Sequence, residues 1–160
     1  DDVSHHGEHY TLAGATHRPR PGRIPLLVGV KGDRALGVAA RHADEWNLWA
    51  SPPTFAARCA ALDRRCEEAG RDPATIDRSA QALVVFSDGA GPVDVARWEA
   101  SGLPFLRGSV AELQDQIGAY ADAGLAELVV PDFTFGGPAG ASDAYERFLA
   151  EVAAPFRPAA

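Results

Sequence analysis

The sequence lacks several features that would mark a membrane or secreted protein. No apolar run approaches the roughly 20 residues that a membrane-spanning helix needs, and no charged and then apolar leader stands at its start. Its 160 residues also contain no methionine, and the first residue is Asp1. We therefore expect part of a longer, cytoplasmic protein without a membrane partner.

An excess of positive charge is missing as well. The sequence has 15 Lys and Arg against 22 Asp and Glu, which gives a formal net charge of −7. Proteins that bind nucleic acids neutralise phosphates with a basic surface, so we expect no nucleic-acid partner. Hydrophobic residues make up 46% of the sequence and charged residues 23%, and these proportions are typical of a globular domain.

Cysteine is scarce, and its spacing suits neither a disulfide nor a metal. Cys59 and Cys66 lie on one expected helix. At a separation of seven residues their Cα atoms would be about 10 Å apart, beyond the reach of a disulfide. Neither belongs to a CxxC pair, which argues against zinc. We expect both thiols to be small apolar core residues.

The histidines near the start are the other candidate metal ligands. His5, His6 and His9 in HHGEH, together with His17, form a loose cluster. Metal sites need several ligands held in a fixed geometry, and no positioned carboxylate accompanies these histidines. We therefore expect a solvated segment and no bound metal.

What the sequence does contain is a regular alternation of strand and helix patterns. The expected strands are Ile24–Val30, Asp44–Trp49, Arg78–Phe86 and Glu127–Asp132. The expected helices are Arg34–Ala43, Ser51 to Gly70, Pro92–Gly102, Ser109 to Gly124 and Ser142–Ala153, and residues 1–23 are expected to form a hairpin or loop that enters a single domain over 24–157. The run from 24 to 30 is uninterrupted and apolar, which is typical of a strand buried on both faces.

The alternation sets the fold class. Strands and helices that alternate with short connections predict an α/β protein with a parallel sheet wrapped by helices. Four βα units make either a small open sheet or half of a (β/α)8 TIM-barrel. A complete barrel takes roughly 250 residues, so this chain is too short to close one.

Polar residues on two expected strands are candidates for lining a pocket. In RSAQALVVF, residues 78–86, the apolar residues alternate and leave Ser79 and Gln81 on the other face. In DEWNLW, residues 44–49, the same alternation turns Glu45, Asn47 and Trp49 inward. Active sites of barrels lie where strands end, so the candidate pocket-lining residues are Asn47, Trp49, Gln81 and Asp132. Buried amides satisfied by the backbone are an equally good interpretation.

The segment GVKGDR, residues 29–34, stands between the first apolar run and the first helix. Its glycines let backbone approach an anion closely, and the helix N-terminus with Lys31 and Arg34 adds positive charge. Asp33 argues for an ordinary turn, because it is a good N-cap and its carboxylate would repel a phosphate. The GxxG spacing is a weak signal. From the residues alone, both interpretations stay open and the ordinary turn is favoured.

Five segments in order carry a resemblance to a known family. They are GEHYTLAGA followed by RPRPGRIPLLVGV, then GDRALGVAARHADEWN, CEEAGRDPATI, GSVAELQDQIGAYADAGLAELVVPDF and the closing helix. Together they resemble the carboxyl-terminal half of the luciferase-like monooxygenases, a (β/α)8 superfamily that depends on flavin or deazaflavin. The ordered set extends over residues 3–156.

The resemblance implies a cofactor and a type of reaction. The family binds FMN or the deazaflavin coenzyme F-420 at the carboxyl-terminal mouth of the barrel, for hydride transfer or oxygenation of a small-molecule substrate. By position, the cofactor's phosphate end would be bound by Gly29, Val30, Lys31, Gly32, Asp33 and Arg34. The carboxylate at position 33 departs from what a phosphate site would favour.

The resemblance also implies that half of the barrel is missing. In this family the amino-terminal half supplies most catalytic side chains, so no catalytic residue is assigned here. We expect the chain to be inactive alone and to pair with its missing half, or with other copies as a homo-oligomer, because open sheet edges and apolar surface favour association.

A basic cluster bears on the choice of cofactor. It comprises Arg18, Arg20, Arg23, Lys31 and Arg34. Coenzyme F-420 ends in an acidic tail that a cationic rim would attract, so the cluster slightly favours the deazaflavin, although a solvated basic loop explains it equally well.

Two rival interpretations remain. One is a non-catalytic half-barrel that binds a partner or an anion. The other is an unrelated phosphate-binding barrel enzyme, such as an aldolase or isomerase. That second class needs a lysine or an acid–base pair at strand ends, and Lys31 and Asp132 are the residues that qualify.

Overall fold

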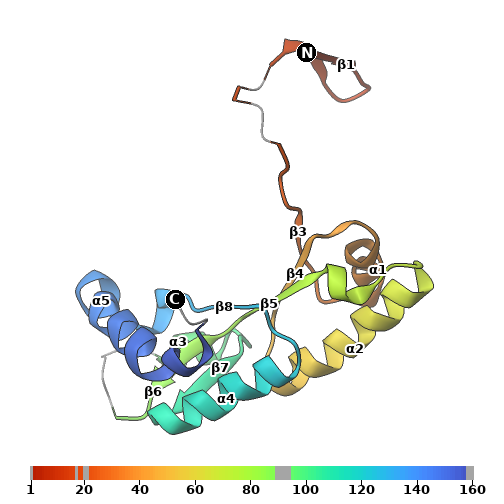
Figure 1. Ribbon diagram of the computed structural model, residues 1–160. Helices are drawn as coiled ribbons and strands as arrows, with labels where there is room; N and C mark the ends of the chain where they lie inside the picture. The colour runs from red at the N-terminus through yellow and green to blue at the C-terminus, as the bar shows by residue number, and fades with distance from the viewer. Residues whose placement is uncertain (1, 17, 20–21, 89–94, 158–160) are drawn as a thin grey trace.

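The computed structural model describes residues 2–16, 18–19, 22–88 and 95–157. After an amino-terminal hairpin, strands and helices alternate along the chain (Figure 1). The elements are β1 (Val3–His6), β2 (Thr11–Ala15), β3 (Leu27–Gly29), α1 (Asp33–His42), β4 (Glu45–Trp49), α2 (Pro52–Glu68), β5 (Asp77–Gln81), β6 (Leu83–Phe86), α3 (Val95–Glu99), β7 (Phe105–Gly108), α4 (Val110–Asp122), β8 (Glu127–Val129) and α5 (Gly137–Arg147), with short 3-10 and π-helical turns between and after them.

A four-stranded parallel sheet organises the body of the protein. Its strand order is β3-β4-β5-β8, and each strand runs parallel to its neighbour. In register, Gly29 lies beside Asn47, Asn47 beside Ser79, and Ser79 beside Glu127. The predicted α/β fold with a parallel sheet is confirmed, and within the described residues the sheet stays open.

One expected strand is in fact two. Residues 78–86 were expected to form a single strand, but it divides at Ala82 into β5 and β6. The backbone N–H of Ala82 donates to Val129 O at 3.3 Å, whereas that of Leu83 donates to Pro104 O at 2.9 Å. The chain therefore leaves one strand partner and takes another within two residues. That new partner leads into β7, which pairs with β6 and was not expected from the sequence.

The hydrophobic core lies between one face of the sheet and its helices. Trp46 stacks on Phe55 of α2 with ring centroids 6.1 Å apart, and Phe55 meets Tyr120 of α4 edge-on at 5.5 Å. Cys59 and Cys66 are free and buried in this core, as predicted. The opposite face of the sheet, called the polar face here, carries Glu45, Asn47, Trp49, Ser79 and Gln81.

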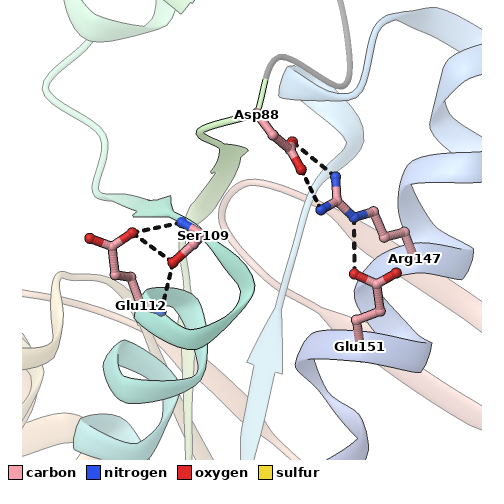
Figure 2. A network of polar contacts seen from close by, with 5 residues as sticks. All are labelled: Asp88, Ser109, Glu112, Arg147 and Glu151. Atoms are coloured by element: carbon pink, nitrogen blue, oxygen red, sulfur yellow. Dashed lines mark hydrogen bonds and ion pairs between the residues drawn. The ribbon is translucent and has the colours of Figure 1, made fainter.

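The helix boundaries follow from local capping. Ser109 Oγ accepts from the Glu112 backbone N–H at 3.4 Å, while the Glu112 carboxylate accepts from the Ser109 N–H at 2.7 Å, which completes the predicted capping box (Figure 2). Beyond the ends of α2 and α4, Gly70 and Gly124 have φ of +67° and +85°. Glycine accepts this left-handed conformation without a steric penalty and stops the helix.

The prediction that residues 24–30 form a strand buried on both faces is wrong. Only Leu27–Gly29 is strand, and Ile24, Leu26 and Leu27 are 70%, 50% and 52% exposed. The reason is position, because β3 lies at the edge of the sheet order and pairs with β4. Leu27 also lies beside Glu45 in register, and so on the polar face.

The β1–β2 hairpin stands apart from the sheet, at the end of an extended segment (Figure 1). All its described residues are exposed. His5 and Tyr10 lie close, with ring centroids 5.0 Å apart. Among the described helices, none is long and apolar enough to cross a membrane.

Candidate ligand-binding site

A cavity of about 490 Å³ opens at the carboxyl ends of β3, β4 and β5. It is lined by Gly29, Val30, Lys31, Asn47, Leu48, Trp49, Gln81, Gly102 and Leu103. In parallel α/β sheets, ligands bind at this end of the strands. Six of the residues singled out in the sequence meet here, although they come from β3 with the turn after it, from β4 and from β5.

The end of β3 is held rigidly beside β4. The Val30 backbone N–H donates to Asn47 O at 3.1 Å, and the indole Nε1–H of Trp46 donates to Val30 O at 2.9 Å. Both backbone polar groups of Val30 are therefore satisfied by protein. A Cβ built on Gly29 would meet nothing within 4 Å, so glycine leaves open space where the cavity wall begins.

The N-terminus of α1 follows directly from this turn. Its N-cap is Gly32, in an extended conformation with φ −77° and ψ 148°, and no side chain caps the helix. The first N–H groups of a helix lack intrahelical partners, and the helix dipole favours an anion near them. An uncapped helix start of this kind is a type of place where anions bind in proteins.

Asp33 does not cap the helix, contrary to the expectation from sequence. Its Oδ1 lies 2.7 Å from Nη1 of Arg58, on α2. Hydrogen bonding and attraction to Arg58 hold the pKa of the Asp33 carboxyl below its usual value. The carboxylate is thus directed at α2. Arg58 compensates its negative charge, which was the argument from sequence against an anion site.

The amides of Asn47 and Gln81 bond to side chains rather than to the backbone. Asn47 Nδ2 donates to Ser79 Oγ at 2.8 Å, and Gln81 Nε2 donates to Asn47 Oδ1 at 2.6 Å. Asn47 is only 5% exposed, whereas Gln81 is half-buried and reaches the cavity. Ser79, which links to this pair, was seen as inward-facing but not taken as part of the site.

Other candidates from the sequence do not line the cavity. The expected strand Glu127–Asp132 ends at Val129, three residues before Asp132. Asp132 therefore lies beyond the strand, exposed, at the start of a 3-10 turn. Gly32, Asp33 and Arg34 border the cavity in sequence but do not line it.

Within the basic cluster, Lys31 is the member that lines the cavity. Arg23 pairs with Asp44, whose pKa is lowered by the Leu26 backbone N–H and by Arg23. Arg18 is an exposed residue of the extended segment, Arg34 is exposed on α1, and Arg20 lies outside the described residues. A continuous cationic rim is therefore not seen in the described part of the chain.

A polar network that the sequence did not reveal lies beyond the ends of β6 and β7 (Figure 2). Arg147 of α5 binds both carboxylate oxygens of Asp88, at 3.0 and 2.6 Å, and its Nε lies 3.1 Å from Glu151. Its guanidinium also lies 4.2 Å from the ring centre of Phe86. These contacts hold α5 against the end of β6. In the sequence, the four-residue spacing between Arg147 and Glu151 was the one sign that these two residues could pair.

Comparison with known proteins gives one family and several solved structures. The family model described as luciferase-like monooxygenase matches residues 1–134. A coenzyme F-420-dependent tetrahydromethanopterin reductase from Methanopyrus kandleri is 19% identical with a TM-score of 0.68, covering 97% of this chain and 58% of that one. A long-chain alkane monooxygenase is 14% identical with a TM-score of 0.67, covering 97% and 46%.

A riboflavin lyase, solved with modified FMN and riboflavin, is 17% identical with a TM-score of 0.67, covering 98% of this chain and 48% of that one. At such identities the likeness shows the fold. This chain spans about half the length of these structures.

Proposed function

The chain belongs to the luciferase-like monooxygenase family, and from this premise we propose that the full-length protein is an oxidoreductase dependent on FMN or coenzyme F-420. It would act on a small organic substrate. When bound, the cofactor would supply either hydride or the electrons that activate oxygen.

The observation that carries this proposal is the cavity beside the uncapped start of α1. Gly29 leaves room for close approach, Lys31 adds a positive charge, and α1 offers free N–H groups with no side-chain cap. A phosphate or phosphodiester is the chemical group that suits this combination. Both cofactors carry one, so the phosphate end would lie at the turn formed by residues 29–34.

The rest of the cavity suits the part of a cofactor next to its phosphate. Trp49 offers an aromatic surface, and Gln81 a polar group that reaches the cavity. Asn47 is nearly buried and holds the Gln81 amide in place. These residues would bind and orient the cofactor, while the family resemblance assigns most catalytic side chains to the amino-terminal half of the barrel.

We also propose that this chain provides the carboxyl-terminal half of a (β/α)8 barrel. Two observations support this. Ile24, Leu26 and Leu27 are largely exposed on and just before the edge strand β3, and the solved relatives are about twice as long as this chain. A preceding βα unit would pair with β3 and cover these side chains, so the chain alone would lack activity.

The test is titration of the purified full-length protein with FMN and with coenzyme F-420, followed by fluorescence. We expect saturable binding of one of them, weakened when excess inorganic phosphate or pyrophosphate competes for the turn. Binding of neither cofactor would contradict the proposal and favour the rival non-catalytic half-barrel. A phosphate-binding barrel enzyme of another class would instead bind phosphate alone.

A further inference from the structure

A chain of hydrogen bonds on the polar face extends farther than the cavity itself. From the cavity inward, Gln81 Nε2 donates to Asn47 Oδ1 at 2.6 Å, and Asn47 Nδ2 donates to Ser79 Oγ at 2.8 Å. Ser79 Oγ in turn donates to the carboxylate of Glu45. The members alternate between β5 and β4, so the chain crosses between the two strands at every step.

The carboxylate at its end determines the direction of every bond. An ionised carboxylate only accepts hydrogen bonds, so the Ser79 hydroxyl proton is committed to Glu45. The hydroxyl oxygen then accepts, which turns the NH2 group of Asn47 toward it and the Asn47 carbonyl toward Gln81. That carbonyl selects the NH2 group of Gln81. Reversing any one amide would bring two donors or two acceptors together.

Because these hydrogen-bonded side chains are buried, a reversed amide would be costly. Ser79 is fully buried and Asn47 only 5% exposed, so water offers these groups little compensation for a mismatched bond. Glu45 is half-buried at the amino end of β4, where it also borders a smaller groove of about 210 Å³ with Ser79 and Glu127. Gln81 is half-buried at the opposite, carboxyl end of β5 and lines the large cavity.

We propose that Glu45 acts as a positioning residue, which fixes the Gln81 amide with its carbonyl oxygen presented to the cavity. This inference rests on the proposed function. A fixed acceptor beside a phosphate cradle recognises a hydroxyl donor close to the phosphate. In FMN and in coenzyme F-420 alike, the group between ring and phosphate is a sugar-alcohol chain bearing hydroxyls. The structure thus assigns Gln81 as the residue that selects this hydroxylated chain, under the control of Glu45.

The test compares two ligands on three proteins, all as full-length protein. The ligands are whichever of FMN or coenzyme F-420 binds more tightly, and its analogue in which only the hydroxyl nearest the phosphate is replaced by hydrogen. The proteins are the native form, Glu45→Gln, and the control Glu127→Gln. The control removes a nearby carboxylate on β8 that does not belong to the series of hydrogen bonds from Gln81 to Glu45. The readout is the ratio of the two dissociation constants, measured by fluorescence titration.

In the native protein we expect the analogue to bind about five- to tenfold more weakly, as the loss of one well-aligned hydrogen bond predicts. Glu45→Gln can donate as well as accept, so it leaves the Gln81 orientation undetermined, and the ratio should fall at least by half. Glu127→Gln should keep the native ratio. A general loss of stability would weaken both ligands together and leave the ratio unchanged.

Gln81→Leu covers the case in which Glu45→Gln does not fold, because it removes the acceptor itself and should bring the ratio to about one. A native-like ratio in Gln81→Leu, or in a folded Glu45→Gln, would overturn the inference while leaving the proposed function intact. Failure of the native protein to bind either cofactor would overturn both.

Discussion

Asp33 Oδ1 lies 2.7 Å from Arg58 Nη1, so the acidic residue in the first turn of α1 is held against α2. The sequence alone suggests the opposite role, since an aspartate before a helix usually caps it. In the structure Gly32 occupies the cap position. Arg58 therefore compensates the Asp33 carboxylate next to the start of α1.

This ion pair leads to the first prediction. Arg58→Met leaves the Asp33 charge uncompensated beside the phosphate cradle. Cofactor affinity in the full-length protein should fall about two- to fivefold, in line with the effect of one charge near a helix terminus. Adding Asp33→Ser to Arg58→Met should restore affinity, because the repelling charge is then gone. A sharp loss of affinity in Asp33→Ser alone would instead identify Asp33 as a direct ligand.

A second prediction concerns the open space at Gly29. Gly29→Val adds a side chain where the structure has no atom within 4 Å. The free energy of unfolding should change by less than about 0.5 kcal/mol, as for other substitutions that meet no packed atoms, while cofactor affinity falls more than about tenfold through steric exclusion. Gly37→Ala on α1 is the control. Equal affinity in Gly29→Val would show that no ligand approaches this wall.

The third prediction uses the buried phenol of Tyr120, which donates a hydrogen bond to Ala50 O. Burial raises the pKa of this phenol above its ordinary value of 10.0. The folded state therefore keeps its proton at a pH where the unfolded state loses it. This contribution to stability is complete below pH about 10 and is lost as the pH rises further.

Urea denaturation between pH 8 and pH 11 checks this dependence. Tyr120→Phe should cost about 1–2 kcal/mol at neutral pH, since Ala50 O loses its partner, and should show a flatter alkaline decline than the native protein. Tyr145→Phe removes a bond to Val130 O from a less buried phenol, whose pKa burial also raises, and it should flatten the alkaline decline less than Tyr120→Phe does. An unchanged alkaline slope in Tyr120→Phe would contradict the assignment.

The fourth prediction tests the half-barrel proposal. Residues 1–160 expressed alone should associate or aggregate, because exposed apolar side chains on an edge strand recruit other strands. Leu27→Lys places a charge at that edge and should reduce association, as measured by size-exclusion chromatography with light scattering. Val38→Lys, at an exposed position on α1, is the matched control. A monodisperse monomer that unfolds cooperatively would argue against the proposal.

The helices could be predicted from sequence because their signals are local. Ser109, Glu112 and Gly124 mark both ends of α4 within the helix and its flanks. Strand β7 was missed because it is four residues long and includes Arg107, so its pattern is too short to stand out. Its existence depends on β6, from which it is separated by α3.

The site could be predicted in part for the same reason. Asn47, Trp49 and Gln81 follow from alternation along single strands, which reveals the face a side chain occupies. The Asp33–Arg58 pair joins residues 25 positions apart, and Gly102 reaches the cavity from the connection before β7. Neither relationship leaves a periodic trace, so both needed the three-dimensional arrangement.

The change of strand partner at Ala82 has a consequence for how this region tolerates changes in length. β5 and β6 meet with no loop between them, and hydrogen bonds to Val129 and Pro104 fix the residues on either side of the joint. Because side chains alternate along a strand, adding or deleting one residue of β5 just before Gln81 would turn Gln81 from the cavity into the helix-packed core. Length variation should therefore be accommodated in the connection between β6 and β7, while residues 79–83 keep their spacing.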